Sequence, residues 1–518
     1  MERRSVLKGV AGTALALSGS TLSGLAMAQQ GKKILVIASG QDIPNFDPHV
    51  ATGYSASWLL RNVYDGLVRV EGNPPKVVPN LASSWTISPD GREYVFKINP
   101  AARFQDGTPV TANAVAYSFK RALRLAKGNA WMIAGVVDPN GIEALDVQTV
   151  RFKLAKPFAP FLAVLPWQFI LNPLVMDTNK GSDDGQEYLR KNTAGSGRFK
   201  VKRAEAGNLY ELERVAQPWA PGGNLDGAIW KIVRETSSQR LMIQRGEAHF
   251  AVDLTSEDMD ALKDRAGVVR ILEPEYRTFS IKMNTEHGPL ADVNLRRAVS
   301  WAFNYKAMLD SAGYAELMVG PLPNGLMNDP KLKVPRTDLA TAKSFLAKTK
   351  YANGGVKLTM VHVTGLEQQR QWSLVLLDSL KQLGIELEIK PMVWPDMVAS
   401  TKTPATMADF FPVYQTANYA DPDNIAFAAY HSPRNGNWQN PVYKNPKVDE
   451  LIEKGRGEID PKKRAAIYAE FQRVVVDDAP DIFGVLEKRR LAMRDNVQGF
   501  RFTPVASNAI EMQHLSLK

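Results

Sequence analysis

The sequence predicts a multi-domain α/β protein, and three features support this fold class. The chain has 518 residues, which is more than one compact hydrophobic core usually holds, so two or three domains are expected. Residues 356–389 have the pattern of a strand, a helix and a second strand, the unit that builds parallel sheets with covering helices. Residues 461–478 carry apolar side chains at helical spacing.

The first 28 residues are predicted to be a cleaved export signal. A basic start containing Arg3 and Arg4 is followed by a weakly apolar stretch over 10–25, and the Ala-Met-Ala sequence that ends at Ala28 matches a signal-peptidase site. The paired arginines resemble a twin-arginine signal, although Val6 stands where that pattern prefers Phe. An uncleaved anchor is disfavoured, because Gly, Ser and Thr interrupt a stretch shorter than the roughly 20 apolar residues of a span.

Three elements are predicted early in the mature chain. The segment KKILVIASG, from Lys32, is expected to be a buried strand. The segment SWTISPDGREYVFKI is expected to form a hairpin, because two β-rich arms flank a Ser-Pro-Asp-Gly turn over 88–91. Thr111 is expected to cap a helix whose apolar residues keep helical spacing and which Gly128 ends.

The later elements predict a parallel sheet and a long surface helix. The segment VKLTMVHV is predicted to be one strand, residues 373–383 a helix closed by Gly384, and IELEI, from Ile385, a second strand. The helix predicted over 461–478 has a stripe that includes Phe471 and Val475. These elements give the second half of the chain its α/β character.

Composition and charge indicate an ordinary soluble globular protein. Hydrophobic residues make up 44% of the chain and charged residues 23%. The formal net charge is +10, but 64 basic residues are dispersed among 54 acidic ones, whereas nucleic-acid binders usually concentrate charge in a stripe or tail. No nucleic-acid partner is therefore expected. The absence of cysteine excludes disulfides, thiolate nucleophiles and Cys-based metal sites.

The sequence contains no recognisable catalytic motif. The patterns H-E-x-x-H and G-x-S-x-G are missing, as are phosphate-loop and dinucleotide-loop patterns. The 6 histidines are scattered, with no i, i+4 pair to place two metal ligands on one helix face. We therefore expect neither an enzyme nor a bound cofactor or metal, while a pair of carboxylates that meet in space stays open as an alternative.

The segment QTANYADPDN, at 415–424, combines two patterns. Asp421 is followed by Pro422, which suits the first helical position, so Asp421 is expected to cap a helix over the apolar run 425–430. Before it, Tyr414, Thr416 and Asn418 alternate with their neighbours as in a strand. On local grounds alone, an exposed strand followed by a helix cap is expected.

Several segments, taken in order, resemble the large extracytoplasmic solute-binding proteins of ABC importers, the family 5 type that includes dipeptide- and oligopeptide-binding proteins. They are NFDPHVATGYSASWLLRNVYDGLV, PNLASSWTISPDGREYVFKINPAARFQDGTPVTANAVAYSFKRAL, TAGSGRFKV, LRRAVSWAFNYKAML, ADPDN and NPKVDELIEKG. The resemblance covers nearly the whole mature chain. The long second segment, with its Trp, SPDG turn and F-x-DGTP order, is the most specific.

The resemblance implies a two-lobed periplasmic-binding-protein fold with an inserted subdomain and a hinge between the lobes. The first lobe would comprise residues 29–73, 191–283 and 491–518, the subdomain 74–190, and the second lobe 284–490. A small organic solute would be enclosed between the lobes, and the closed form would be read by an ABC permease and ATPase complex in the inner membrane. A monomeric periplasmic receptor without a cofactor is the expected protein.

The resemblance also implies where the solute lies. In peptide binders of this family the segment before the Asp-Pro-Asp motif lines the cleft, and an Asp three residues before it holds the α-ammonium of the ligand. That position here is Asn418, an amide without charge, so peptides, sugar-like and opine-like solutes are all alternatives. The other expected ligand-binding residues are Tyr54, Ser55, Trp167, Trp394, Tyr414, Gln415, Thr416, Ala417, Tyr419 and Asp421.

Two functions from other classes remain open on the sequence. A hydrolase or carbohydrate-active enzyme outside the cytoplasm would be favoured by two carboxylates that face each other across the cleft at roughly 5–9 Å. A periplasmic chaperone or peptide sensor would be disfavoured by tight, stoichiometric binding of one small compound.

Overall fold

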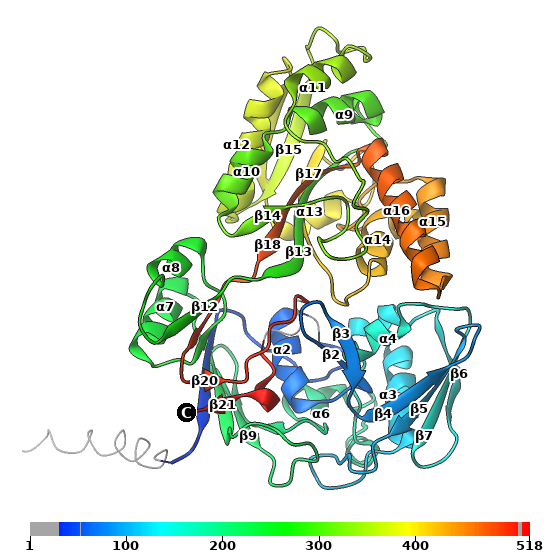
Figure 1. The fold of residues 1–518 in the computed structure, drawn as a ribbon, viewed down its shortest axis with the longest axis vertical. Helices are drawn as coiled ribbons and strands as arrows, with labels where there is room; N and C mark the ends of the chain where they lie inside the picture. Colours follow the sequence, from blue (N-terminus) through cyan, green and yellow to red (C-terminus); the bar gives the residue numbers. More distant parts are fainter. Residues whose placement is uncertain (1–30, 52, 506–509) are drawn as a thin grey trace, which may run out of the picture.

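The computed structural model describes residues 31–51, 53–505 and 510–518, which form two lobes that each contain a mixed sheet (Figure 1). The predicted export signal and its cleavage after Ala28 lie outside these residues. Within the described ranges, no helix combines the length and the apolarity that crossing a membrane requires.

The first lobe is built on a seven-stranded sheet with the order β12-β19-β11-β1-β10-β9-β8. These strands are β1 (Ile34–Ser39), β8 (Phe199–Glu205), β9 (Leu209–Arg214), β10 (Gly227–Ile232), β11 (Phe250–Ala251), β12 (Val268–Ile271) and β19 (Leu491–Arg494). The prediction of a buried strand at the mature start is confirmed, because β1 pairs in parallel with β10 and β11 and places Leu35 and Ile37 in the core. Helices α2 (Tyr54–Val63), α5 (Pro173–Thr178), α6 (Gln186–Lys191), α7 (Thr236–Arg245) and α8 (Ser256–Ala261) and the pair β20 (Val497–Gln498) and β21 (Ser516–Leu517) complete it.

A smaller subdomain is inserted into the first lobe. Its four-stranded antiparallel sheet has the order β4-β5-β7-β6, with β4 (Ala82–Ile87), β5 (Glu93–Ile98), β6 (Val137–Ala144) and β7 (Thr149–Leu154). The predicted hairpin is confirmed as β4 and β5. The subdomain also holds α3 (Ala112–Leu125), η1 (Gly128–Met132), α4 (Phe161–Val164) and η2 (Leu165–Trp167), and β2 (Val68–Glu71) pairs with β3 (Lys76–Pro79) beside it.

The predicted cap of α3 is confirmed, but its predicted end is wrong. Thr111 Oγ1 accepts a hydrogen bond from Ala114 N–H at 3.3 Å. The helix ends at Leu125, and Ala126 takes the left-handed conformation with φ 49°. Gly128 instead begins η1, where a Cβ would lie 2.8 Å from His49 O, so this glycine permits a close approach of two backbone segments.

The second lobe is built on a six-stranded sheet with the order β14-β18-β13-β17-β15-β16. The strands are β13 (Pro274–Met283), β14 (Ala315–Leu317), β15 (Lys357–Val363), β16 (Glu386–Met392), β17 (Phe410–Thr416) and β18 (Asp481–Lys488). The accompanying helices are α9 (Val293–Ala302), α10 (Tyr305–Ala312), α11 (Leu339–Leu346), α12 (Glu367–Lys381), α13 (Trp394–Ser400), α14 (Asp423–Tyr430), α15 (Pro446–Gly457) and α16 (Pro461–Asp478).

The parallel unit predicted in this half is confirmed, since β15 and β16 pair in parallel and α12 connects them. The connecting helix begins at Glu367, six residues before the predicted start at 373, because its polar first turn has no apolar stripe to identify it. The long helix predicted over 461–478 is confirmed as α16, and the Asp460 side chain caps it.

The chain crosses between the lobes twice, and the two crossings lie side by side. One joins β12 to β13 and the other joins β18 to β19, and the N–H of Arg489 donates to Glu273 O at 2.7 Å between them. Strand β13 was expected in the first lobe, up to residue 283. It pairs with β17 and β18 of the second sheet, so strand pairing moves this boundary to residues 272–273.

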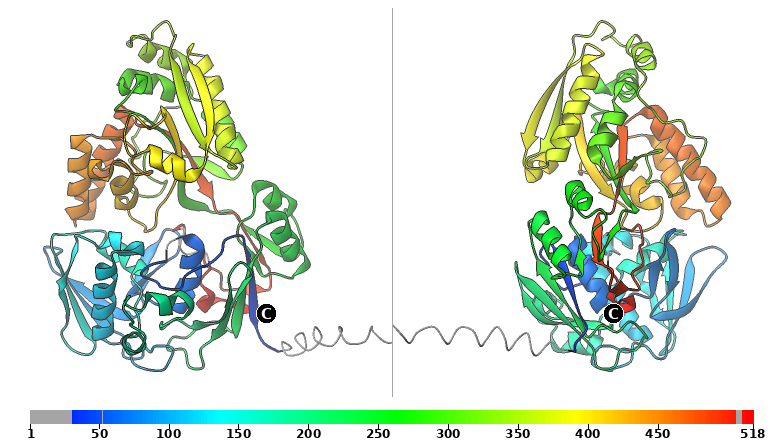
Figure 2. Two further views of the ribbon diagram at one scale, coloured as in Figure 1. Left: turned by 180° about the vertical axis from the view of Figure 1, so that it is seen from behind. Right: turned by 60° about the vertical axis from the view of Figure 1, so that its left-hand side comes forward.

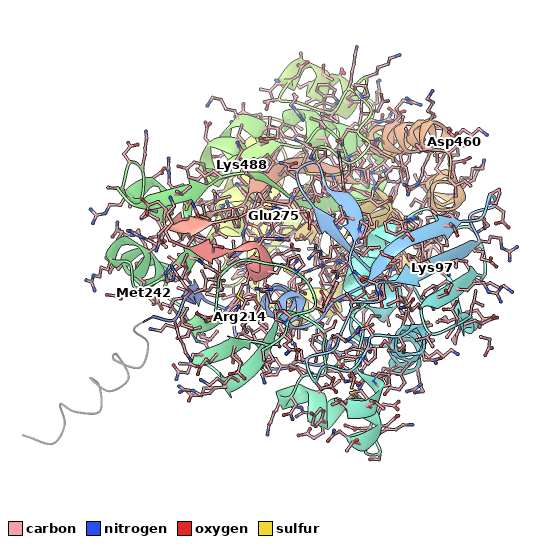
Figure 3. All side chains as sticks on the ribbon, turned by 60° about the horizontal axis from the view of Figure 1, so that its bottom comes forward. Lys97, Arg214, Met242, Glu275, Asp460 and Lys488 are labelled. Carbon is pink, nitrogen blue, oxygen red and sulfur yellow. The ribbon has the colours of Figure 1, made fainter. Side chains whose placement is uncertain are left out.

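The two lobes also approach each other far from these crossings. In both views of Figure 2, α15 of the second lobe, drawn in orange, lies over the inserted subdomain. In the view of Figure 3, charged side chains such as Lys97, Arg214 and Asp460 lie in different parts of the molecule. Oppositely charged residues also pair across strands, as Lys200 and Glu213 do at 3.1 Å, so positive and negative charges are mixed on the surface.

Candidate functional site

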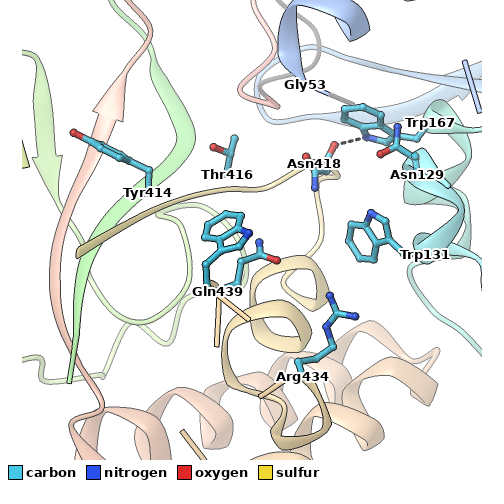
Figure 4. Close-up of a pocket in the computed structure, with 11 residues that line it drawn as sticks. Gly53, Asn129, Trp131, Trp167, Tyr414, Thr416, Asn418, Arg434 and Gln439 are labelled. Carbon is cyan, nitrogen blue, oxygen red and sulfur yellow. Dashed lines mark hydrogen bonds between the residues drawn. The ribbon is translucent and has the colours of Figure 1, made fainter. Parts of the chain in front are cut away.

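A cavity of about 350 Å³ lies between the inserted subdomain and the second lobe. The first lobe and its subdomain contribute Gly53, Gly128, Asn129, Trp131 and Trp167. The second lobe contributes Tyr414, Thr416, Asn418, Arg434, Trp438 and Gln439 (Figure 4). The volume suits a small organic molecule, and the lining combines aromatic faces with a few polar groups, as in most ligand sites.

Strand alternation decides which part of the segment 414–419 faces the cavity. Tyr414, Thr416 and Asn418 line it. The residues between them make contacts elsewhere: Gln415 Nε2 donates to Gln439 O at 3.2 Å, and the N–H of buried Ala417 donates to Tyr276 O at 2.8 Å. The period of two along β17 and its extension therefore separates the expected residues into cavity-lining and packed positions.

Tyr419 is packed rather than exposed to the cavity. Its side chain belongs to the hydrophobic cluster of the inserted subdomain, and its hydroxyl donates to Asp423 Oδ2 at 2.8 Å. Burial is the main factor that raises the pKa of Tyr419 well above its usual value, so the hydroxyl remains a hydrogen-bond donor.

Asn418 lines the cavity, and its backbone groups are already paired. Asn418 O accepts a hydrogen bond from Trp167 Nε1 at 2.5 Å across the gap between the lobes. Its N–H donates to Asn424 Oδ1 at 3.1 Å. The amide side chain is therefore the group at this position that a solute would meet (Figure 4).

Arg434 is the one charged residue among the described residues of the lining. It ends η4 (Ser432–Arg434), its guanidinium lies 5.8 Å from the Phe427 ring centroid, and its Nε has no hydrogen-bond partner among the described residues. The half-buried Tyr414, whose pKa is raised mainly by desolvation, stays a neutral phenol and donates to Gln368 Oε1 at 2.8 Å. The cavity therefore presents one cation and several neutral polar groups, which suits a ligand that carries a carboxylate.

Two other expected residues, Ser55 and Trp394, lie outside the lining. Ser55 is buried and its hydroxyl donates to Asp42 O at 2.9 Å. Trp394 is 39% exposed and packs edge-on against Trp438, with ring centroids 5.7 Å apart, so it supports a lining residue from behind. The side chain of Tyr54 lies outside the described residues.

Asp421 is held in a buried ion pair instead of facing the cavity. Its two carboxylate oxygens each accept from the Arg464 guanidinium at 2.7 Å. Asp421 Oδ1 also accepts from the N–H of Asp423 at 2.9 Å. The prediction that Asp421 caps the helix is wrong by one residue, because α14 begins at Asp423 and Pro422 occupies its N-cap position. This carboxylate neutralises Arg464 and is not available to a solute.

Sequence reasoning missed more than half of the described lining residues. Arg434 comes from η4, Trp438 and Gln439 from the irregular stretch after it, and Asn129 and Trp131 from η1. A tryptophan within the polar run 435–440 was an available signal, because such a side chain in a loop rich in Asn and Gly has no obvious core to join.

One group of residues has the geometry of a metal site, but its neighbours explain it differently. Oxygen or nitrogen atoms of Glu71, Glu511 and His514 lie within 4.8 Å of one another. Glu71 also pairs with Arg69 at 3.2 Å and with Arg501 at 3.1 Å. Since arginines already neutralise the carboxylate, we interpret the group as an ion-pair network that ties the C-terminal segment to β2.

Comparisons with known proteins agree with this architecture. Residues 76–437 match the family model described as bacterial extracellular solute-binding proteins, family 5 Middle. The probable D,D-dipeptide-binding periplasmic protein DdpA of Escherichia coli strain K12 is 31% identical over 519 residues, covering 97% of this chain and 98% of the relative. The glutathione-binding protein GsiB of Shigella dysenteriae is 25% identical over 488 residues, covering 91% and 92%. The solved structure of DppA from Helicobacter pylori in complex with the peptide STSA has a TM-score of 0.78 at 24% identity, covering 95% of this chain and 99% of that one.

Proposed function

Because the chain belongs to the bacterial extracellular solute-binding proteins of family 5, we propose that it is the substrate-binding component of an ABC importer for small peptide-like solutes. The observation that carries the proposal is the cavity of about 350 Å³ between the lobes, with Arg434 as the only cation among the described residues that line it. A peptide-like solute would place its carboxylate on Arg434 and its apolar groups on the faces of Trp131, Trp167 and Trp438.

The lining favours solutes whose net charge is negative. Among the described residues that line the cavity none is an Asp or Glu, and the carboxylates of Asp421 and Asp423 are engaged by Arg464 and Arg456. A bound ammonium group would therefore lack an opposite charge and would share the cavity with Arg434. N-acylated peptides, glutathione and opine-like conjugates match this pattern better than a plain dipeptide, and a neutral sugar would leave Arg434 unpaired.

The same lining argues against the enzymatic alternative. A retaining or inverting glycosidase needs two carboxyl groups that face each other, and the described lining offers none. We propose that the protein binds and releases its solute unchanged. We also propose that the mature chain begins after residue 28, that it acts as a periplasmic monomer and that its closed form is presented to the permease and ATPase complex.

Thermal-shift screening and calorimetry test the proposed solute class. The panel comprises D-alanyl-D-alanine, its N-acetyl derivative, its C-terminal amide, glutathione, octopine and sucrose. A bound solute stabilises the folded protein by RT ln(1 + [L]/Kd). We expect the N-acetyl dipeptide and glutathione to give the largest shifts and the C-terminal amide to give none. Shifts with sucrose alone would contradict a peptide-like solute.

Replacing Arg434 with glutamine is expected to weaken binding of the best solute in this panel by roughly 10- to 100-fold, because a hydrogen bond to a charged group contributes about 1.5–3 kcal/mol. Isothermal titration calorimetry measures the change. Arg245→Gln is the matched control, since the Arg245 side chain is 66% exposed on α7 and affinity should not change. Equal losses for a solute and its C-terminal amide would show that Arg434 does not hold the carboxylate.

A further inference from the structure

The inserted subdomain contacts the second lobe through a segment that lies outside the cavity lining. This segment, residues 156–159, follows β7 and faces α15. Lys156 Nζ lies 2.8 Å from Glu453 Oε2, and the N–H of Ala159 donates to Arg456 O at 2.8 Å. Both contacts join lobes that, within the described ranges, are covalently connected by the two crossings at the opposite side of the molecule (Figure 2).

Arg456 lies at the centre of this contact. Its guanidinium is 3.7 Å from the ring centroid of Phe427, in the second lobe, and 5.2 Å from that of Phe158, in the inserted subdomain. The side chain is only 11% exposed, so its charge interacts with both rings in a partly desolvated setting, where cation–π attraction is strongest. One arginine thus contacts aromatic rings of both lobes.

A buried carboxylate holds Arg456 and a second residue of the contact. Asp423 Oδ1 lies 3.3 Å from Arg456 Nε, and Asp423 Oδ2 accepts from the Tyr419 hydroxyl at 2.8 Å. Tyr419, although part of the second lobe, packs within the hydrophobic cluster of the inserted subdomain that also contains Phe158. Asp423 is fully buried beneath both side chains, so it fixes their orientation toward the subdomain.

We infer that Tyr419, Asp423 and Arg456 form a clasp that keeps the second lobe closed on the inserted subdomain in the absence of solute. The clasp contacts residues 156–159, which include Phe158. Its own three residues do not line the cavity. They are positioning residues for solute binding, because they set the fraction of molecules in which the two walls of the cavity face each other. This inference goes beyond the proposed function and does not depend on the identity of the solute.

The clasp changes how closure relates to binding. If closure depended on the solute alone, the solute-free protein would be open, and part of the binding free energy would be spent on closing it. With a clasp, a fraction of the molecules is already closed before the solute binds. The apparent affinity for the solute is then nearer to the intrinsic affinity of the closed form. The Trp167–Asn418 hydrogen bond, which also joins the lobes, forms in the same closed arrangement.

Electron–electron distance measurements on the solute-free protein test the inference. The chain has no cysteine, so spin labels can be attached uniquely at Val147→Cys on the turn between β6 and β7, where Val147 is 65% exposed, and at Lys462→Cys on exposed α16. We expect the short distance to dominate in the labelled parent. Arg456→Gln should lower the ratio of short to long distances by roughly tenfold, the size expected when a desolvated cation–π contact is lost.

Two further variants keep the result interpretable. Tyr419→Phe retains the ring but removes the hydroxyl bonded to Asp423, and it should shift the distances in the same direction by a smaller factor even if Arg456→Gln fails to fold. Lys454→Gln, on the same helix but paired with Glu450 within it, should leave the distribution unchanged. The clasp would be overturned if the solute-free parent showed long distances alone. It would also be overturned if Tyr419→Phe and Lys454→Gln gave identical distributions. Either result would leave the proposed solute-binding function intact.

Discussion

Arg464→Met is expected to lower the free energy of unfolding by about 3–5 kcal/mol, the loss typical of breaking a buried ion pair from one side. Arg464 is buried, donates to both oxygens of Asp421 at 2.7 Å and also donates through Nε to Gly455 O at 2.7 Å. Removing the guanidinium leaves the buried carboxylate of Asp421 without an opposite charge. Urea denaturation of the solute-free protein measures the difference.

Two comparisons identify the buried charge as the cause. Lys454→Met breaks an exposed pair with Glu450 on α15 and should cost less than about 1 kcal/mol. Asp421→Asn combined with Arg464→Met removes both charges, so the double variant should be more stable than Arg464→Met alone. A loss below about 1 kcal/mol for Arg464→Met, or a double variant that is less stable than the single one, would refute this account.

These ion pairs explain why the segment at 415–424 combines features of a strand and of a helix cap. Asn418 presents an amide to the cavity, Asp421 neutralises Arg464, and Asp423 holds Tyr419 and Arg456. Burial raises the pKa of Asp423 to about 6, against the opposing effect of Arg456. The segment is therefore both a wall of the cavity and the base of the contact between the lobes.

The part of the site that could be predicted depends on regular structure. Alternation along β17 places Tyr414, Thr416 and Asn418 on one side, and this period is visible in the sequence. Arg434 and Trp131 are brought to the cavity by the short 3-10 helices η4 and η1, which are too short for a local periodicity to identify. Their convergence depends on how the inserted subdomain is placed against the second lobe, which is set by contacts distant in sequence.

The boundary of the first lobe shows the same limitation. Strand β13 follows β12 after two residues, so the sequence pattern suggests continuity within one sheet. Its partners are β17 and β18, more than 120 residues away for every paired position. The residues of a strand decide whether the strand forms, and this can be recognised locally. Its distant partners decide which sheet it joins, and they cannot be recognised from the strand's own sequence.

A second large effect is expected from acid. His49 is buried, its Nδ1 accepts from Arg121 Nη1 at 3.1 Å, and its Nε2–H donates to Phe169 O at 3.0 Å. A proton on Nδ1 would face a guanidinium N–H, so this geometry requires the neutral ring. Burial, together with the nearby charge of Arg121, lowers the pKa of His49 to about 4, and Asp47 only partly opposes this shift.

The sign of the pH effect follows from the difference between the two states. In the unfolded chain His49 has its ordinary pKa of 6.5, so between pH 6.5 and about 4 the unfolded state binds a proton that the folded state excludes. The stabilising contribution is therefore complete above pH 6.5 and is lost as the pH falls, by about 3 kcal/mol at pH 4.

Denaturation at several pH values should show a shallower decline of the free energy of unfolding in His49→Asn than in the parent. Asp423, whose raised pKa acts in the opposite direction, is present in both proteins and cancels in this comparison, so parallel curves would show that folding does not lower the pKa of His49.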